Sequence, residues 1–347
     1  MSTALQSSVQ AVAPPSQLRQ KLLRAKQELC ATVLGYEDEI EMMLLCLVAD
    51  GNVSALGDPG TGKTLSMKAL ARVLGGSHYR RVQMVPDLMP ADILGTEVWN
   101  KETGEFTYMH GPLNPLVNLF HADEINRTPP RTQAALLEAM EEKQFSVPGC
   151  TSQTKNTYPL HEVCLVLATR NAIDSVEGTY PLPSAELDRF AVELYFRRLS
   201  REKELEVVRK TSFARHSLAA TQEGVLSITD IPSIRNEVES TVVCKERAFQ
   251  YAENIIFATR PEGCPASLRK VFSKGVSVRA AQWALRLARV RAYMNGGTYV
   301  DPADIKHAMN FTLPHRLCID EEKLYKGLTV QSVIAQLLSE VKIPTEI

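Results

Sequence analysis

The sequence predicts an α/β protein with a parallel sheet, followed by an all-helical C-terminal domain. Up to about residue 197, short apolar runs typical of buried strands alternate with amphipathic helical patterns. That alternation is the signature of a parallel sheet covered by helices. Beyond residue 197 the strand-like runs stop and helical patterns follow one another. With 347 residues the chain is also long enough for two domains.

The elements of the first domain follow from periodicity and turn signals. In order, we expect helices at 18–34 and 37–49, a strand at 53–56, a helix at 65–74, a strand at 80–85, a strand at 116–122, a helix at 129–142 and strands at 163–168 and 192–196. Two further stretches, 96–108 and 145–162, are interrupted by turn residues and are predicted to be hairpins.

The second domain is expected to contain helices only. The helical patterns cover 199–210, 245–259, 278–295 and 302–309. The predicted organisation is therefore a disordered lead-in over 1–17, an α/β core over 18–198, and over 199–347 a helical domain with a C-terminal tail that begins after about residue 326.

Composition narrows the classes of function. A formal net charge of −1 gives no basic surface for non-specific nucleic-acid binding, so such binding is not favoured. The longest apolar run, 42–49, falls short of the roughly 18 residues of a membrane span. The first residues lack the basic start and apolar stretch of a secretory signal, and the seven cysteines include no CxxC pair. We therefore expect reduced thiols and a cytoplasmic protein.

A phosphate-binding loop is predicted immediately after the strand at 53–56. Its residues fit the pattern GxxxxGK[ST] and are Gly57, Asp58, Pro59, Gly60, Thr61, Gly62, Lys63 and Thr64. A strand before the loop and a helix after it give the context that this motif requires. Glycines let backbone N–H groups turn inward around phosphate oxygens, and the helix N-terminus adds a favourable dipole. Lys63 is expected to reach the β- and γ-phosphates of ATP, and Thr64 to ligate Mg²⁺.

The carboxylates that an ATP site needs are predicted at the end of the strand at 116–122. Asp123 and Glu124 follow that strand directly, and ligands of an α/β sheet gather at the carboxyl ends of its strands. We expect Asp123 to hold Mg²⁺ through its water shell and Glu124 to act as general base toward the attacking water. His121 is interpreted as a packed strand side chain rather than a ligand.

Asn171 and Arg189 are ambiguous from their positions alone. Asn171 follows the strand at 163–168 and could bind the γ-phosphate, orient the water, or simply cap a turn. Arg189, in LPSAELDRF, could form a local ion pair with Asp188 or Glu186. It could instead supply the cation that stabilises the transition state of phosphoryl transfer.

Three long stretches together resemble the MoxR group of AAA+ ATPases. They are HADEINRTPPRTQAALLEAMEEKQFSV, LATRNAIDSVEGTYPLPSAELDRF and GVSVRA with the later GGTYVDPADIKHAMNFTLPHRL, and the resemblance covers about residues 20–320. It implies an AAA+ P-loop NTPase core with strand order 5-1-4-3-2, a helical lid, and hexameric rings with ATP sites between subunits. It also implies one hairpin inserted in the second helix and another before the sensor-1 strand, where 96–108 and 145–162 lie.

The resemblance assigns further roles residue by residue. Asn171 matches sensor 1, Arg189 matches the arginine finger that reaches the neighbouring subunit's γ-phosphate, and Arg279 matches sensor 2. The region around Gly35 (VLGYEDEI) matches the segment that lies against adenine. The sequence departs from the family pattern at three places: Val278 replaces a proline before Arg279, Ala172 replaces a proline after Asn171, and the segment 260–275 is longer than expected.

For function, the resemblance implies an ATP-driven remodeller of a client enzyme, acting in maturation or metal insertion with a partner that contains a von Willebrand A domain. Two alternatives remain open from the sequence. One is a motor subunit of the magnesium-chelatase I type, although LPSAELDRF and GTYVDPADIKHAM fit the MoxR pattern better. The other is a nucleotide-gated scaffold with little turnover. Action on DNA is disfavoured by the net charge.

Overall fold

A five-stranded parallel sheet forms the centre of the protein. The structure, a computed structural model, describes residues 16–147, 157–171, 179–212, 218, 221–325 and 327–344. The strands of the sheet are, in chain order, β1 (Val53–Gly57), β3 (Tyr79–Gln83), β6 (Leu119–Asp123), β9 (Leu165–Arg170) and β10 (Val192–Phe196). Within the described part of the chain they lie side by side as β10-β1-β9-β6-β3, all parallel. Counted along the chain this order is 5-1-4-3-2, which confirms the predicted fold.

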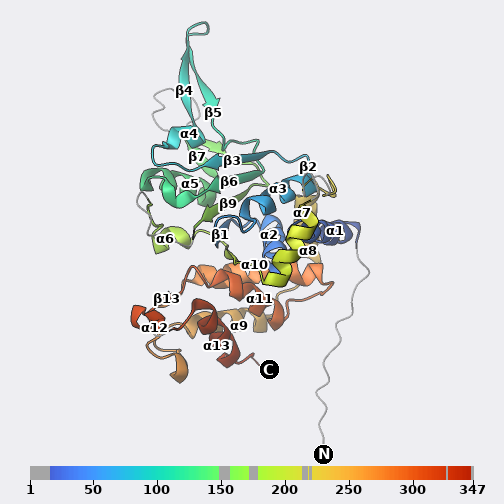
Figure 1. Ribbon diagram of the computed structural model, residues 1–347, viewed down its shortest axis with the longest axis vertical. Helices are drawn as coiled ribbons and strands as arrows, with labels where there is room; N and C mark the ends of the chain where they lie inside the picture. The colour runs from blue at the N-terminus through green and yellow to red at the C-terminus, as the bar shows by residue number, and fades with distance from the viewer. Residues whose placement is uncertain are drawn as a thin grey trace, which may run out of the picture.

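Both faces of the sheet are buried under helices. Successive residues of a strand point to opposite faces. Accordingly, Leu119 and Leu167 pack in one apolar cluster, while their neighbours Phe120 and Ala168 pack in another. The first cluster contains α1 (Gln17–Thr32), α2 (Glu37–Ala49) and α3 (Lys63–Val73), and the second contains α4 (Pro90–Leu94) and α5 (Pro130–Glu142). Figure 1 shows these two groups of helices on either side of the sheet.

Two antiparallel strand pairs extend this core. β4 (Gly95–Asn100) pairs with β5 (Glu105–His110), within and beside the stretch 96–108, and this pair projects far from the sheet (Figure 1). β7 (Gln144–Ser146) pairs with β8 (Thr157–Pro159), in the stretch where the second hairpin was expected. The rings of Tyr108 and Tyr158 stack with their centroids 4.2 Å apart, so the two strand pairs contact each other.

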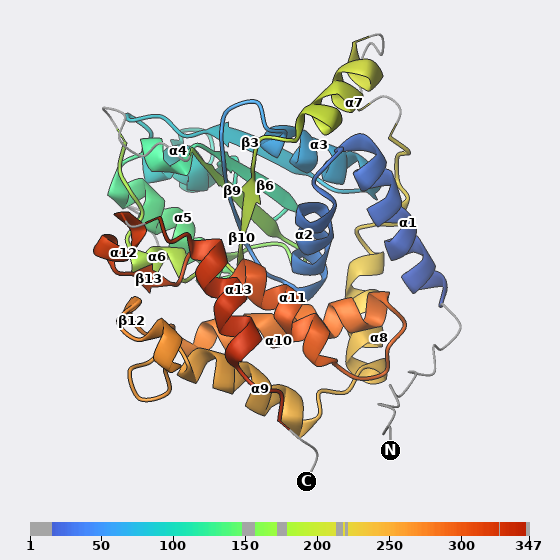
Figure 2. The same ribbon diagram turned by 60° about the horizontal axis from the view of Figure 1, so that its bottom comes forward.

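The C-terminal part is largely helical. It contains α7 (Arg201–Thr211), α8 (Asp230–Thr241), α9 (Glu246–Phe257), α10 (Val278–Met294), α11 (Pro302–Thr312), α12 (Glu321–Tyr325) and α13 (Val330–Glu340). We call α8–α13 the lid. Figure 1 shows α10 between the sheet-bearing core and the outer helices α9 and α13, and Figure 2 shows α7 standing apart from the lid near α3. No helix in the described ranges is both long and apolar enough to cross a membrane.

The lid differs from the sequence prediction in three respects. It contains α8 and α12 at positions where no helix was predicted. It is not wholly helical, because β12 (Phe272–Lys274), in the segment 260–275, pairs with β13 (Cys318–Ile319). The residues expected to be a tail include α13, which buries Val333 and Leu337 against the rest of the lid. Three predicted features lie wholly or largely outside the described residues: the lead-in, the middle of the second hairpin, and the Ala172 departure.

A buried carboxylate joins the lid to the core. Glu41 of α2 accepts hydrogen bonds from Lys26 of α1 and, at 2.9 Å, from Nε of Arg291 of α10. Arg291 also donates from Nη1 to Asp304 of α11 at 2.7 Å. Because a half-satisfied buried charge is costly, this network favours one position of α10 over α2.

Candidate nucleotide-binding site

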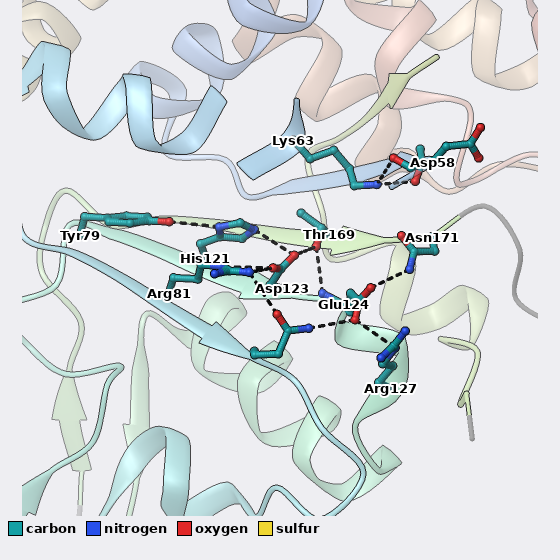
Figure 3. Close-up of polar contacts among 12 residues, drawn as sticks. Asp58, Lys63, Tyr79, Arg81, His121, Asp123, Glu124, Arg127, Thr169 and Asn171 are labelled. Carbon is teal, nitrogen blue, oxygen red and sulfur yellow. Dashed lines mark hydrogen bonds and ion pairs between the residues drawn. The ribbon is translucent and has the colours of Figure 1, made fainter. Parts of the chain in front are cut away.

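The loop between β1 and α3 has the backbone of a phosphate-binding loop. Gly60 and Gly62 have φ angles of 82° and 93°, which glycine adopts readily and other residues rarely. A Cβ at Gly60 would have no atom within 4 Å, so the loop opens onto free space there. The ammonium of Lys63 donates to the carbonyl of Gly57 and, at 3.1 Å, to that of Asp58 (Figure 3). Burial lowers the pKa of Lys63, and nearby carboxylates oppose that shift.

A cavity of about 440 Å³ adjoins this loop. Its lining residues are Thr32, Val33, Leu34, Tyr36, Pro59, Gly60, Thr61, Gly62, Leu65, Arg198, Leu199, Glu204, Val207 and Val208. The lining is mainly apolar and includes four residues of the predicted loop, as a planar base beside a phosphate chain would require.

Gly35 shapes the cavity without lining it. Its neighbours Leu34 and Tyr36 are lining residues. Gly35 itself has a φ of +84°, and a Cβ there would lie 2.6 Å from Cδ2 of Leu199. The hydroxyl of Tyr36 donates to the carbonyl of Arg197 at 2.6 Å, and burial raises the pKa of Tyr36 to about 12. These contacts hold the segment around Gly35 against residues 197–199, immediately before α7.

Asp123 ends β6 and is surrounded by donors. Thr169 donates from Oγ1 to its Oδ1 at 2.6 Å, Arg81 donates from Nε to its Oδ2 at 3.0 Å, and His121 Nε2 lies 3.5 Å from Oδ1. Burial raises the pKa of Asp123, but the contacts with His121, Thr169 and Arg81 outweigh it and leave the pKa below its usual value. The carboxylate is therefore ionised at neutral pH. His121 is packed in the strand, as expected, yet it also contacts the site.

Glu124 is fixed by hydrogen bonds from several elements. Its backbone lies in the left-handed region with φ 60°, and its N–H donates to Oγ1 of Thr169 at 2.9 Å. Oε1 accepts from the amide of Asn171 at 2.8 Å, and Oε2 accepts from Gln83 at 2.9 Å and forms an ion pair with Nε of Arg127 at 3.0 Å. Strained backbone of this kind clusters at functional sites. Figure 3 shows both carboxylates and Asn171 gathered below Lys63.

Four contributors to this site were not predicted: Arg81, Gln83, Arg127 and Thr169. Arg81 and Gln83 occupy alternate positions of β3 and lie opposite His121 and Asp123 in the register of β3 with β6. Alternating polar residues in the predicted strand at 80–85 were the available signal. They point to the site only once β3 is known to adjoin β6.

The two predicted arginines form a separate cluster. Nε of Arg189 lies 3.1 Å from Oε2 of Glu141, and Arg279 of α10 donates to Oε1 of the same carboxylate. Neither arginine lines the cavity at the phosphate loop; both line another, also about 440 Å³, together with Asp188 and Arg316. The ion pair of Arg189 is thus with Glu141 of α5 rather than with Asp188 or Glu186.

The residues at the phosphate loop fit ATP and Mg²⁺. Free space at Gly60, the adjacent ammonium of Lys63 and the apolar cavity suit a nucleoside triphosphate. The hydroxyl of Thr64 and the ionised carboxylate of Asp123 are oxygen ligands, which Mg²⁺ prefers, and Mg²⁺ is usually bound by one or two such groups together with phosphates.

Comparison with known proteins agrees with this geometry. Residues 52–192 match the model of the ATPase family associated with various cellular activities (AAA), and residues 270–336 match the AAA lid domain. The chain is 33% identical to chaperone MoxR1 of Mycobacterium tuberculosis, over 93% of this chain and 82% of that protein. It is 35% identical to the uncharacterized protein YeaC of Bacillus subtilis, over 93% of this chain and 95% of that one.

The chain belongs to the MoxR family of AAA+ ATPases. A solved structure of a candidate ATPase from Cytophaga hutchinsonii has the same fold, with a TM-score of 0.82 and 34% identity over 94% of this chain and 96% of that one. In this MoxR-family chain the AAA match spans β1 to the start of β10, and the lid match spans β12 to the middle of α13.

Proposed function

We propose that this MoxR-family protein hydrolyses Mg²⁺-bound ATP at sites that a neighbouring subunit completes. The observation that carries the proposal is the division of the candidate residues into two clusters. Lys63, Asp123, Glu124 and Asn171 surround the phosphate loop, while Arg189 is paired with Glu141 at a different cavity. A single chain therefore offers the phosphate site without the arginine.

The phosphate-loop cluster has groups for each task of hydrolysis. The backbone of residues 57–62 and the ammonium of Lys63 bind the phosphates, and Thr64 and Asp123 would hold Mg²⁺. When bound, the metal neutralises charge on the β- and γ-phosphate oxygens. Glu124 accepts the proton of the attacking water, and the amide of Asn171 keeps the carboxylate pointing in one direction.

The arginine cluster supplies a further cation to the ATP site in trans. An arginine at the γ-phosphate is worth about 10³–10⁵ in rate in related nucleotide hydrolases. Arg189 and Arg279 meet on one carboxylate, Glu141, so a subunit presents them as a pair. We assign both to the ATP site of the neighbouring subunit in a hexameric ring.

The work driven by hydrolysis is proposed to be the remodelling of a client protein. One relative is named chaperone MoxR1, which supports a chaperone-like activity. The projecting β4–β5 pair exposes half of Trp99 in edge contact with Phe106, and offers apolar surface to a polypeptide. The proposed client is an enzyme that needs maturation or metal insertion. We further propose that a protein with a von Willebrand A domain acts as partner, and that the assembly works in the cytoplasm.

Mixed assemblies test the shared site. Glu124→Gln and Arg189→Ala should each bind ATP and fail to hydrolyse it. Mixing the two should restore hydrolysis, because Glu124→Gln subunits donate intact arginines to the intact Glu124 of their neighbours. Arg24→Ala, which removes an exposed arginine of α1, is the control and should hydrolyse ATP at the parent rate without being mixed with another variant. Parent-level hydrolysis by Arg189→Ala would contradict the assignment, and ATP binding without turnover by the parent protein would favour a nucleotide-gated scaffold.

A further inference from the structure

A buried arginine of the lid holds the loop that carries Arg189. Arg316 is 7% exposed, and its guanidinium donates to the backbone at three positions that flank Arg189. Nη2 donates to the carbonyls of Asp188 at 2.9 Å and Phe190 at 2.6 Å, and Nη1 donates to that of Ala191 at 3.1 Å. Nε donates to the carboxylate of Asp188 at 2.7 Å. The backbone on both sides of Arg189 is thus tied to one side chain.

Arg316 is itself anchored to the end of α11. Its Nη1 also donates to the carbonyl of Thr312 at 2.7 Å. The preceding residue, His315, is buried, and its Nε2 lies 3.2 Å from the carbonyl of Phe190, which fixes the tautomer with a proton on Nε2. Two adjacent lid residues therefore form hydrogen bonds with the loop that carries Arg189.

A second lid element holds the loop from the start of α10. Ser277, the residue before that helix, donates to both carboxylate oxygens of Asp188 at 2.9 and 3.0 Å. The side chain of Arg189 is directed differently, because its partner Glu141 belongs to the core helix α5. The lid thus sets the position of the backbone of Arg189, and a core carboxylate sets the direction of its guanidinium.

We propose that Arg316 is a positioning residue that couples the lid of one subunit to the arginine offered to the next. Movement of the lid carries the loop 188–191 with it, so Arg189 reaches the neighbouring ATP site only when its own lid is correctly placed. The proposal rests on the proposed role of Arg189. A guanidinium is required because its planar fork holds five donors in a fixed arrangement, whereas an ammonium cannot bind the same carbonyls together.

Arg316→Lys tests the proposal, with Arg289→Lys as the matched control. Arg289 is another lid arginine that donates to two carbonyls, those of Val242 at 2.8 Å and Glu239 at 2.6 Å, away from the loop 188–191. For Arg316→Lys we expect unchanged ATP affinity and a kcat lowered roughly 100-fold, the cost of a displaced catalytic group. Arg289→Lys should retain the parent kcat.

The decisive measurement is hydrolysis by Arg316→Lys mixed with Glu124→Gln. The mixture should exceed the sum of the two variants measured alone, because the defect lies in the donated arginine and not in the subunit's own site. If Arg316 instead supports the ATP site of its own subunit, the mixture should show no recovery of hydrolysis.

The mixture of Arg189→Ala with Glu124→Gln serves as reference. If the reference recovers and the Arg316→Lys mixture does not, the coupling is wrong and the shared site stands. If the reference mixture does not recover hydrolysis either, both the coupling through Arg316 and the shared ATP site are wrong. Should Arg316→Lys fail to fold by circular dichroism, Asp188→Asn replaces it. That variant weakens the contacts of the same loop with Arg316 and Ser277. Its kcat should fall less than that of Arg316→Lys, and hydrolysis should recover when it is mixed with Glu124→Gln. An unchanged kcat, or no recovery in the mixture, would overturn the coupling.

Discussion

The side-chain amide of Asn171 donates a hydrogen bond of 2.8 Å to Oε1 of Glu124. The two residues follow the neighbouring strands β9 and β6, whose parallel register brings their carboxyl ends together. A neutral amide directs the carboxylate without adding a charge to the site. The direction of the proposed general base therefore depends on an adjacent strand.

Asn171→Ala should lower kcat for ATP hydrolysis with little change in ATP affinity. Loss of the amide lets the carboxylate of Glu124 turn away from the attacking water, and misplacement of a catalytic group costs roughly 100-fold. Steady-state kinetics over a range of ATP concentrations separates kcat from KM. Asn310→Ala is the control, since Asn310 is an exposed lid residue whose amide donates to the carbonyl of Lys306 in its own helix. A raised KM with an unchanged kcat would show that Asn171 binds substrate instead.

Thr169→Val should weaken Mg²⁺ binding in the presence of ATP. The hydroxyl of Thr169 donates to Asp123 and accepts from the N–H of Glu124, so it orients both acidic residues. Removal of such a supporting contact typically costs about 10–100-fold in metal affinity. A titration of ATPase activity with Mg²⁺ measures the shift. Thr259→Val is the control, because it also removes a buried hydroxyl with two hydrogen bonds, but in the lid. An equal shift in the Mg²⁺ dependence of this control would show that general destabilisation causes the effect.

His315→Gln should make stability less sensitive to acid. Burial and the adjacent Arg316 lower the pKa of His315 well below its usual value. The unfolded chain therefore binds more protons than the native one once the pH falls below about 6.5, and the free energy of unfolding decreases with it. The urea midpoint of the parent protein should fall between pH 7 and 5, and fall less for His315→Gln. His110 is exposed, and the urea midpoint of His110→Gln should change with pH as that of the parent protein does. If the midpoint of this control also fell less than that of the parent, the role of His315 would be refuted.

Glu193→Ala should destabilise the core strongly. Glu193 of β10 forms a buried ion pair with Arg170 of β9 across β1, and removal of one partner of such a pair costs about 3–5 kcal/mol. Urea unfolding followed by far-UV circular dichroism provides the measurement. Glu206→Ala, which breaks the exposed pair with Lys210 on α7, is expected to leave the midpoint unchanged. Equal effects of the two substitutions would be inconsistent with a buried pair.

The sequence predicted the features that contiguous residues encode. The loop from Gly57 to Thr64 lies between a strand and a helix as expected, because its glycines and flanking periodicities are local. Asp123 and Glu124 stand at the end of a buried strand for the same reason. The strand order came from family resemblance and is confirmed by the pairing of the five strands. The trans role of Arg189 remains a prediction.

The sequence analysis missed features whose partners lie far apart in the chain. Gln83 and Thr169 reach Glu124 only because β3 and β9 flank β6. The helix α13 was mistaken for a tail, although Val333 and Leu337 have helical spacing, because a short amphipathic segment is stable as a helix only when another surface buries it.

By itself, then, the sequence determined a phosphate loop, two carboxylates at a strand end and a change from α/β to helical structure, since backbone conformation and periodicity are properties of neighbouring residues. The tertiary structure decided which side chains share a site. It separated Arg189 from the phosphate loop of its own chain and tied the backbone on both sides of Arg189 to Arg316, 127 positions further along the chain. Such contacts depend on how the lid packs against the core, and no local pattern in the chain specifies that packing.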